Sequence, residues 1–477
     1  MNLKKEKMMF KKILLIFIII LLFSQISQAK NLGNDINTDE YPQDSKVLPE
    51  VTVNPDYVIS GSVEKNVDMT LDNCIKLALG NNPQISAAFQ DILAADARIK
   101  QVWSNFFPTI SWQTSYTRLR QLQLSDALGQ SLEFNYYLLG QVSLQQMLYD
   151  FGVTQNQATI RKLDYEGYKK TFEAIVNDVI YQTKDAYYNV LYAYENKRVA
   201  LDTVEKYQLF YNQAKAFYET GENPKVDVTI AETNLSNAKL KLIQADNAVN
   251  LAIAKLNNIM GVPFIEKYDI TDRLQYKPVN LTFEQAIDTA RESRPELKLA
   301  EIKVEGSHQT VNLTKKSFLP SLTFEGQYQR GGKSWNSNYG FNIGGYLTFP
   351  AINAMLIRNE IKEAKYLYDK ELANAKNTQN AIYLEIQNAY LKLEEKRNQL
   401  PVAILNVKQS KENYELSYGR YRVGEASPTE LKDAENTYEQ AQLTYYTALY
   451  EYNSARAQLE KAIGKNITDD EVIEIEK

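Results

Sequence analysis

The sequence contains two copies of one long unit, and this duplication limits the folds that the chain can adopt. Residues 70–118 align with residues 282–330 at a constant offset of 212, and residues 186–261 align with residues 389–464 at an offset of 203. The unit spans roughly 200 residues, whereas the repeats of solenoid proteins span about 20 to 50. We therefore expect one architecture made of two equivalent halves, not two unrelated domains.

The first 29 residues have the pattern of a secretory signal peptide. Lysines precede an apolar run from Ile13 to Phe23, and Ser27-Gln28-Ala29 resembles a cleavage site with small residues. The apolar run is too short to span a bilayer, although an uncleaved N-terminal anchor is the alternative. We expect an exported mature chain.

Cys74 is the only cysteine, and it lies inside the first repeat. Because no cysteine directly follows the predicted signal peptide, we expect a mature N-terminus without a lipid anchor. A single cysteine cannot form an internal disulfide, and the apolar helical face that carries Cys74 indicates packing.

Charge and composition exclude several classes of function. The formal net charge is -5, and removal of five lysines and one glutamate with residues 1–29 makes it about -9. An acidic exported chain is not expected to bind nucleic acid. There is one histidine, no His/Cys/carboxylate cluster at metal-ligand spacing and no phosphate-binding glycine loop. We therefore expect no enzyme activity, no cofactor and no metal site.

The repeats and their flanking segments predict a domain organisation. A signal peptide (1–29) and an extended leader (30–68) precede repeat 1 (69–264), and a linker (265–280) joins it to repeat 2 (281–467), which an acidic tail (468–477) follows. Each repeat is expected to contain two helices, two strands, a long helix and a returning helix. The predicted strands are about 109–120, 133–147, 321–331 and 338–349, and the predicted helical hairpins are about 150–262 and 352–464.

The four predicted strands alternate apolar and polar residues. Ile110, Trp112, Thr114 and Tyr116, for example, alternate with polar neighbours. Aromatic, alternating strands of about ten residues are typical of outer-membrane barrels, and a half-buried sheet in a soluble protein is the alternative. The change of offset from 212 to 203 predicts a first strand-connecting loop nine residues longer than the second, exposed outside the cell.

Four strands cannot close a barrel, and an open edge in lipid leaves backbone groups without hydrogen bonds. We therefore expect an oligomer. Two copies give an eight-stranded barrel, and side chains fill the interior of a barrel of that size. Three copies give twelve strands and leave a lumen.

The segments after the strands predict very long helices. Residues 150–223 contain no proline, which allows a helix of about 70 residues, roughly 100 Å long. Residues 353–423 allow another, with a kink expected at Pro401. The returning helices carry heptad seams that alternate large residues with alanine and predict supercoiling. The seams are Val228, Ala231, Leu235, Ala238, Leu242, Ala245, Val249, Ala252 and Leu256, then Leu431, Ala434, Tyr438, Ala441, Tyr445, Ala448, Tyr452, Ala455 and Leu459.

These features resemble the TolC-type outer membrane efflux proteins. The resemblance rests on the duplicated unit, on Phe-Phe-Pro (106–108) and Phe-Leu-Pro (318–320) before the strands, and on Tyr-Arg-Val-Gly-Glu-Ala-Ser-Pro-Thr-Glu-Leu (421–431). It implies a mainly α protein with a membrane β-barrel, in which a homotrimer forms a twelve-stranded barrel continuous with a periplasmic α-helical barrel. It also implies contacts with outer-membrane lipid, a periplasmic adaptor and an inner-membrane transporter of the RND or ABC class.

The resemblance further implies a gate near the turn of the second hairpin. Aligned on Gly424, the acidic constriction falls on Glu430 and Asp433, and Tyr421 takes the place of a tyrosine that holds the gate shut. Ala426 replaces a family arginine, so the gate must be held differently here. The hairpin turns, with Gly221, Val423, Gly424 and Glu425, are the expected adaptor contacts.

Structural roles compete with these assignments. Glu430 can instead complete a capping box with Ser427, and Tyr421 can serve packing alone. Asp433 lies one turn further along and is not needed for capping, although the helix dipole favours any early acidic residue. We expect Asp433 to carry a lumen-facing charge.

The sequence thus predicts a passive outer-membrane exit duct of a tripartite efflux or type I secretion system. The alternative is a structural coiled-coil protein of the cell envelope without a channel, for which the heptads suffice. The strands distinguish the two hypotheses, since a coiled-coil spacer has no use for four aromatic, alternating segments between its helices.

Overall fold

The computed structural model describes residues 69–125, 131–221, 224–262, 270, 272–332, 338–351 and 353–466. The predicted signal peptide (1–29), leader (30–68) and acidic tail (468–477) lie outside these residues. The chain divides into two compact units. The sheet unit contains Arg98–Thr159 and Asn312–Ile361, and the helical unit contains Ile160–Val311 and the chain from Lys362 onward, together with the segment that ends at Ala97.

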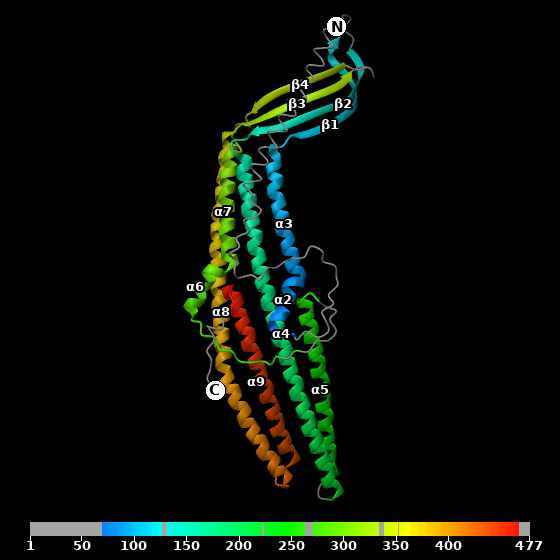
Figure 1. Cartoon of the computed structure of the whole chain (residues 1–477), viewed down its shortest axis with the longest axis vertical. Helices are drawn as coiled ribbons and strands as arrows, with labels where there is room; N and C mark the ends of the chain where they lie inside the picture. The colour runs from blue at the N-terminus through cyan, green and yellow to red at the C-terminus, as the bar shows by residue number, and fades with distance from the viewer. Residues whose placement is uncertain are drawn as a thin grey trace. The chain divides into compact units, whose positions relative to one another are not determined.

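Both repeats have the same order of elements, which confirms the predicted helix-helix-strand-strand-long helix-helix plan (Figure 1). Repeat 1 contains α2 (Leu71–Asn81), α3 (Pro83–Trp103), β1 (Thr109–Ser125), β2 (Ser131–Tyr149), α4 (Val153–Glu219) and α5 (Lys225–Ile259), with a short 3-10 turn, η1 (Ser104–Phe106), before β1. Repeat 2 contains α6 (Phe283–Ser293), α7 (Pro295–Lys316), β3 (Ser321–Gly332), β4 (Asn338–Thr348), α8 (Ala354–Arg422) and α9 (Pro428–Ile463).

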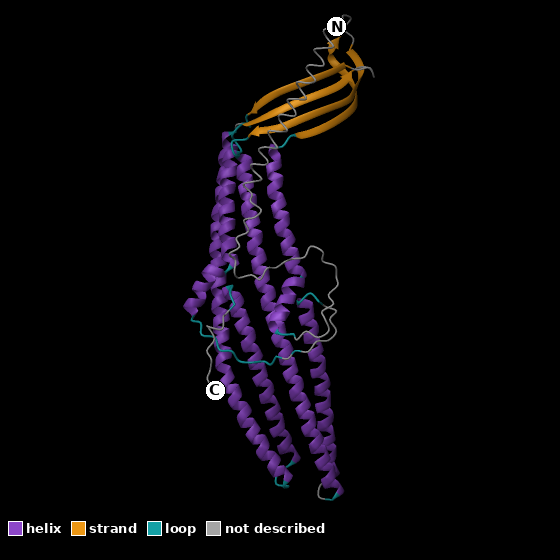
Figure 2. Ribbon diagram, viewed as in Figure 1, coloured by secondary structure: helices purple, strands orange, loops and turns teal. Residues whose placement is uncertain are grey.

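The four strands form one antiparallel sheet in the order β1-β2-β3-β4 (Figure 2). Trp112, Val142, Tyr328 and Phe341 are directly paired in one row across all four strands. Residues opposite one another on paired strands share a face of the sheet. All four side chains are exposed, and Trp112 is 77% exposed. One face of the sheet therefore presents an uncovered apolar row.

The extra residues of repeat 1 lengthen its strands, so the prediction of a longer first loop is wrong. β1 and β2 contain 17 and 19 residues, while β3 and β4 contain 12 and 11. The backbone pairing of β1 and β2 continues past the predicted strand end to Gln121 and Leu132. The segments between paired strands, 126–130 and 333–337, are equal in length and lie outside the described residues. Ladder hydrogen bonds satisfy the backbone groups that a loop would leave to solvent.

The short first helix of each repeat begins at a threonine cap and ends before a proline. The Thr70 side chain accepts a hydrogen bond from the backbone N–H of Asn73, and Thr282 forms a full capping box with Gln285. Such caps satisfy N–H groups that the helix leaves unpaired. Pro83 and Pro295 then start α3 and α7, since proline is well suited to the first turn of a helix.

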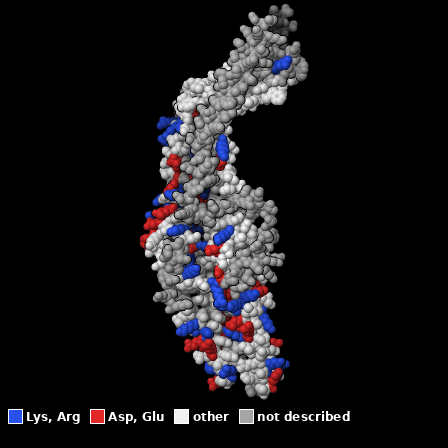
Figure 3. Space-filling model, viewed as in Figure 1, with Lys and Arg blue, Asp and Glu red and all other residues white. Residues whose placement is uncertain are grey.

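The helical unit contains two antiparallel hairpins, one formed by α4 and α5 and the other by α8 and α9. α4 and α8 contain 67 and 69 residues, close to the expected length. Pro401 lies inside α8, which continues on both sides of it, and the kink stays a prediction. On the face in view, acidic and basic side chains are intermixed over the helices (Figure 3).

The predicted heptad seams are buried or half-buried along both returning helices. α4 also contacts α9 directly, because the ring of Tyr192 stacks on Tyr450 with centroids 5.3 Å apart. These two rings pack against a large apolar cluster in which Cys74 is fully buried, and burial, with the charge of Asp272, raises the pKa of the Cys74 thiol to about 12. Its role is packing.

The segment before α6 is held against both hairpins. The Tyr187 hydroxyl donates to the Asp272 carboxylate over 2.6 Å, and the Tyr452 hydroxyl donates to the Lys277 carbonyl over 2.9 Å. The predicted linker is therefore attached to α4 and α9 where it is described.

None of the described helices has an apolar stretch long enough to cross a membrane.

Candidate functional site

The candidate site lies at the turns of the two helical hairpins. At the second turn Gly424 has a φ of +76°, which favours glycine, and its N–H donates to the Tyr421 carbonyl over 3.1 Å. The N–H of Glu425 donates to the Arg420 carbonyl over 2.8 Å. At the first turn Gly221 has a φ of +81°. The two turns thus use the same left-handed glycine to end the long helix.

The residues expected to contact an adaptor are exposed. Gly221, Gly424 and Glu425 are exposed, and the Val423 side chain is 65% exposed. An exposed valine at a turn offers apolar area to a partner, while Glu425 offers charge.

Glu430 forms an ion pair across the second turn. Its carboxylate lies 2.5 Å from the Arg420 guanidinium, and the same guanidinium donates to the Glu425 carbonyl over 3.2 Å. Ser427 caps α9 by accepting from the Glu430 N–H over 3.2 Å. The described contacts of Glu430 are thus its backbone N–H with the Ser427 cap and its carboxylate with Arg420.

Tyr421 is buried between the hairpins. It packs with Tyr207 and Phe210 of α4 and with Leu431 of α9 in a small apolar cluster that also includes Leu235. Burial, with the charge of Asp227, raises the pKa of its phenol, which stays neutral. Tyr421 therefore joins the second hairpin to the first, and a small hollow opens beside it that Asp227 and Lys432 help to line.

Asp433 is exposed one turn beyond Glu430 on the same face of α9. Its carboxylate forms no ion pair with any residue that the structure describes. Nor does a hydrogen bond or ion pair join Tyr421 to Glu430 or Asp433 within the described chain. The three residues singled out from the sequence thus occupy one turn region but have separate surroundings.

Further along the hairpins, ion pairs connect the first hairpin to the second. Lys206 of α4 lies 3.2 Å from Glu435 of α9 and 2.9 Å from Asp202 of α4. Lys241 of α5 lies 2.8 Å from Glu439 of α9. Glu435 is fully buried, and one of its carboxylate oxygens, Oε2, has no hydrogen-bond partner among the described residues.

Aromatic rings enclose Lys206. Its ammonium lies 5.0 Å from the ring centroid of Tyr414 and 4.7 Å from that of Tyr438, and these two rings are stacked. Ammonium groups are attracted to aromatic faces at such distances. Arg420 and this charged cluster were not found from the sequence, because their partners lie on other helices or across a turn.

Within the described residues, no group of three or more His, Cys, Asp or Glu side chains has an arrangement that could hold a metal ion.

Comparison with known proteins identifies the family of this chain. The model of the family "Outer membrane efflux protein" matches residues 74–262 and 286–465, which are the two repeats. The chain belongs to the outer membrane efflux protein family.

Individual relatives agree with this assignment over most of the chain. The probable efflux pump outer membrane protein TtgC of Pseudomonas putida is 20% identical over 414 residues, which cover 83% of each chain. The outer membrane protein TolC of Vibrio cholerae is 21% identical over 409 residues, which cover 83% of this chain and 90% of the relative. The crystal structure of the Campylobacter jejuni CmeC outer membrane channel has a TM-score of 0.70 at 21% identity, covering 85% of this chain and 90% of that chain.

The chain is therefore an outer-membrane exit duct of an efflux or secretion system. This assignment replaces the alternative of a structural coiled-coil protein without a channel. Its relatives are channel proteins of efflux systems.

Proposed function

We propose that the protein is a homotrimeric, passive conduit and not an enzyme. The observation that supports a trimer is the four-stranded sheet itself. β1 and β4 are its edge strands, and unpaired edges within lipid leave backbone groups without partners at several kcal/mol each. Pairing β1 of one copy with β4 of the next removes every edge once the ring closes.

Three copies give a twelve-stranded barrel, which is wide enough to leave a lumen. The exposed row of Trp112, Val142, Tyr328 and Phe341 supports this arrangement, because it provides an apolar surface for outer-membrane lipid. The helical hairpins then form the periplasmic part of the duct.

Family membership supports partners on the periplasmic side. One relative is named an efflux pump outer membrane protein and another a toxin and drug export protein. We propose that a periplasmic adaptor contacts the exposed turns at Gly221, Val423, Gly424 and Glu425, and joins the duct to an inner-membrane RND or ABC transporter. The transporter supplies the energy and selects the cargo.

The gate is proposed at the second hairpin. Tyr421 holds that hairpin against α4 by packing, and Arg420 holds the turn closed through Glu430. Arg420 thereby offers a guanidinium close to Ala426, where the family arginine is missing. Because Glu430 is paired, the free carboxylate of Asp433 is the better candidate for an acidic ring around the axis.

Light scattering of the detergent-extracted protein tests the architecture. The protein part should have about three times the mass of the mature chain, as a twelve-stranded barrel requires. A stable monomer with native β-content overturns the trimer. Substitution of Val423 and Glu425 together by glycine should weaken adaptor binding without changing this mass, and unchanged adaptor binding removes the proposed contact.

A further inference from the structure

The charges that join the two hairpins are unequal in number, and only Glu435, Glu439 and Lys206 are largely buried, which suggests a role beyond holding the helices together. Asp202, Glu435 and Glu439 provide three carboxylates, whereas Lys206 and Lys241 provide two ammonium groups. The other titratable groups that face Glu435 are Tyr207 of α4 and Tyr414 of α8, which burial keeps neutral. When all three carboxylates are ionised, the cluster therefore carries one uncompensated negative charge.

Glu435 is the member of the cluster that is least able to bear this charge. It is 0% exposed, and only one of its oxygens contacts Lys206. Its other oxygen has no hydrogen-bond partner among the described residues. By contrast, Asp202 is half-exposed, and both oxygens of Glu439 accept from Lys241. A buried carboxylate oxygen without a partner destabilises the ionised form far more than the neutral form.

Lys206 cannot offset the whole effect. Burial lowers the pKa of this ammonium, but the charges of Glu435 and Asp202 raise it by more than burial lowers it. Lys206 therefore stays charged. It is shared between two carboxylates. We accordingly expect the pKa of Glu435 to be raised, because burial opposes ionisation and Asp202 and Glu439 add repulsion that Lys206 only partly compensates.

We propose that Glu435 is a proton-sensitive contact between the two helical hairpins, which keeps them packed when it is neutral and favours their separation when it is ionised. The position of Glu435 supports this directly, because it is on α9 of the second hairpin and its partner Lys206 is on α4 of the first. Separation of the hairpins gives the ionised carboxylate access to water. The proposal does not depend on which substrate the duct exports.

The direction of the pH effect follows from linkage. A carboxyl group whose pKa is raised in the packed state binds its proton more tightly there than in the separated state. Acidification therefore stabilises the packed hairpins. This stabilisation is fully present below the ordinary glutamate pKa of 4.5 and is lost as the pH rises through the higher pKa of the packed state.

Hydrogen–deuterium exchange of the full-length protein tests the proposal. Peptides that cover residues 200–210 and 430–442 report the opening of this contact, once each rate is divided by the intrinsic exchange rate at that pH. Between about pH 8 and about pH 5 an ordinary glutamate stays mostly ionised. In this range we expect the opening equilibrium to fall as the pH is lowered, on the order of tenfold for each unit by which the pKa of the packed state lies above about 5. An opening equilibrium that does not change with pH overturns the proposal.

Variants identify the titrating group. Glu435→Gln, which resembles the protonated form, should be strongly protected at both pH values and lose the pH dependence. Glu439→Gln should keep the pH dependence, since Glu439 is fully paired. Retained dependence in E435Q, or lost dependence in E439Q, overturns the assignment to Glu435.

A second variant keeps the test decisive if E435Q does not fold. Among the described residues Lys206 is the only cation that contacts Glu435, so Lys206→Met should move the midpoint of the pH dependence to higher pH. An unmoved midpoint excludes Glu435 as the titrating group.

Discussion

Asn82 and Arg294 occupy equivalent positions in the two repeats, and each donates a side-chain hydrogen bond to an equivalent backbone carbonyl. Asn82 donates to the Ile259 carbonyl over 2.8 Å, and Arg294 donates to the Ala462 carbonyl over 2.8 Å. The donors are 212 residues apart and the acceptors are 203 apart, as in the sequence repeat. In each half the returning helix ends against the junction of the two short helices, so the duplication extends to individual hydrogen bonds.

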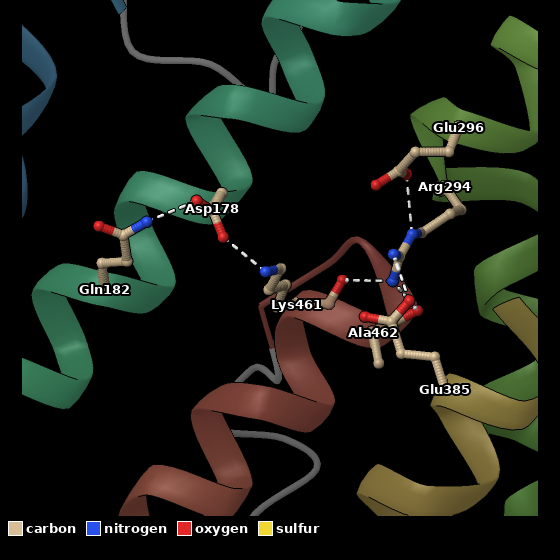
Figure 4. A network of polar contacts seen from close by, with 7 residues as sticks. All are labelled: Asp178, Gln182, Arg294, Glu296, Glu385, Lys461 and Ala462. Atoms are coloured by element: carbon tan, nitrogen blue, oxygen red, sulfur yellow. Dashed lines mark hydrogen bonds and ion pairs between the residues drawn. The ribbon is translucent and has the colours of Figure 1, made fainter. Parts of the chain in front are cut away.

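In the second repeat, charged residues surround this joint between the end of the returning helix and the two short helices. Arg294 is 5% exposed, and its guanidinium also contacts Glu385 of α8 over 2.6 Å and Glu296 over 2.8 Å (Figure 4). Beside it, Lys461 of α9 pairs with Asp178 of α4. The end of α9 is thereby connected to three other helices, whereas the neutral Asn82 side chain donates to Ile259 at the end of α5 and caps α3 by accepting from the Gln84 N–H.

The first prediction uses the asparagine of repeat 1 as a matched replacement. Arg294→Ala leaves the Ala462 carbonyl without its donor and the carboxylates of Glu296 and Glu385 without their cation, and an unsatisfied buried group costs about 1–3 kcal/mol. Arg294→Asn restores the donor found in repeat 1 and should recover part of the loss. Thermal unfolding followed by circular dichroism measures both variants. Equal melting temperatures for R294A and the parent contradict the role of this joint.

The second prediction concerns close packing along α9. Ala441 is 2% exposed on the heptad seam, and Ala441→Leu adds three carbon atoms to a packed position. Overpacking of this kind typically costs about 1–3 kcal/mol. Gln440→Leu, at the exposed neighbouring position, is the control and should leave stability unchanged. If both variants melt as the parent does, the seam is not tightly packed at Ala441.

The sequence predicted the order of elements because its periodicities change where the structure changes. Period two around Trp112 marks a strand, and the heptad through Ala441 marks a helix with one packed seam. The ends of the strands were harder to predict from the sequence. β1 continues to Ser125, beyond the end of the internal repeat at Arg118, because hydrogen bonds to β2 extend it there.

The site was only partly predictable for a related reason. Heptad positions identify the face of α9 that packs in the seam, but Glu435 and Glu439 lie beside the seam and are buried because α4 and α5 cover a second face. No local pattern in α9 encodes that second contact. Arg420 is ten residues from Glu430, and only the turn at Gly424 brings them together.

The third prediction tests the pair at the second turn. Arg420→Met removes the guanidinium and leaves the Glu430 carboxylate free near Asp433. In a planar bilayer the resting channel should then become more cation-selective, because the number of unpaired carboxylates rises. Arg420→Lys keeps the positive charge and should change selectivity less. A decrease of cation selectivity in R420M contradicts the proposed role of this pair.

The last prediction concerns Asp433. Three copies around the axis would form a negative ring, and rings of carboxylates favour cations. Multivalent cations added from the periplasmic side should therefore block the channel. One charge contributes about 1 kcal/mol to an ion at 4 Å in water, so Asp433→Asn should weaken the block by on the order of tenfold or more and lower the cation selectivity. Light scattering should still give the parent oligomer, since Asp433 is exposed and pairs with no described residue.

Glu430→Gln is the matched control for Asp433→Asn. Because Arg420 already neutralises Glu430, this variant should change the block much less than Asp433→Asn does. An equal effect of the two variants means that both carboxylates face the ion. If Asp433→Asn leaves both selectivity and block unchanged, the acidic constriction lies elsewhere in the duct and Asp433 serves only the start of α9, where the helix dipole favours a negative charge.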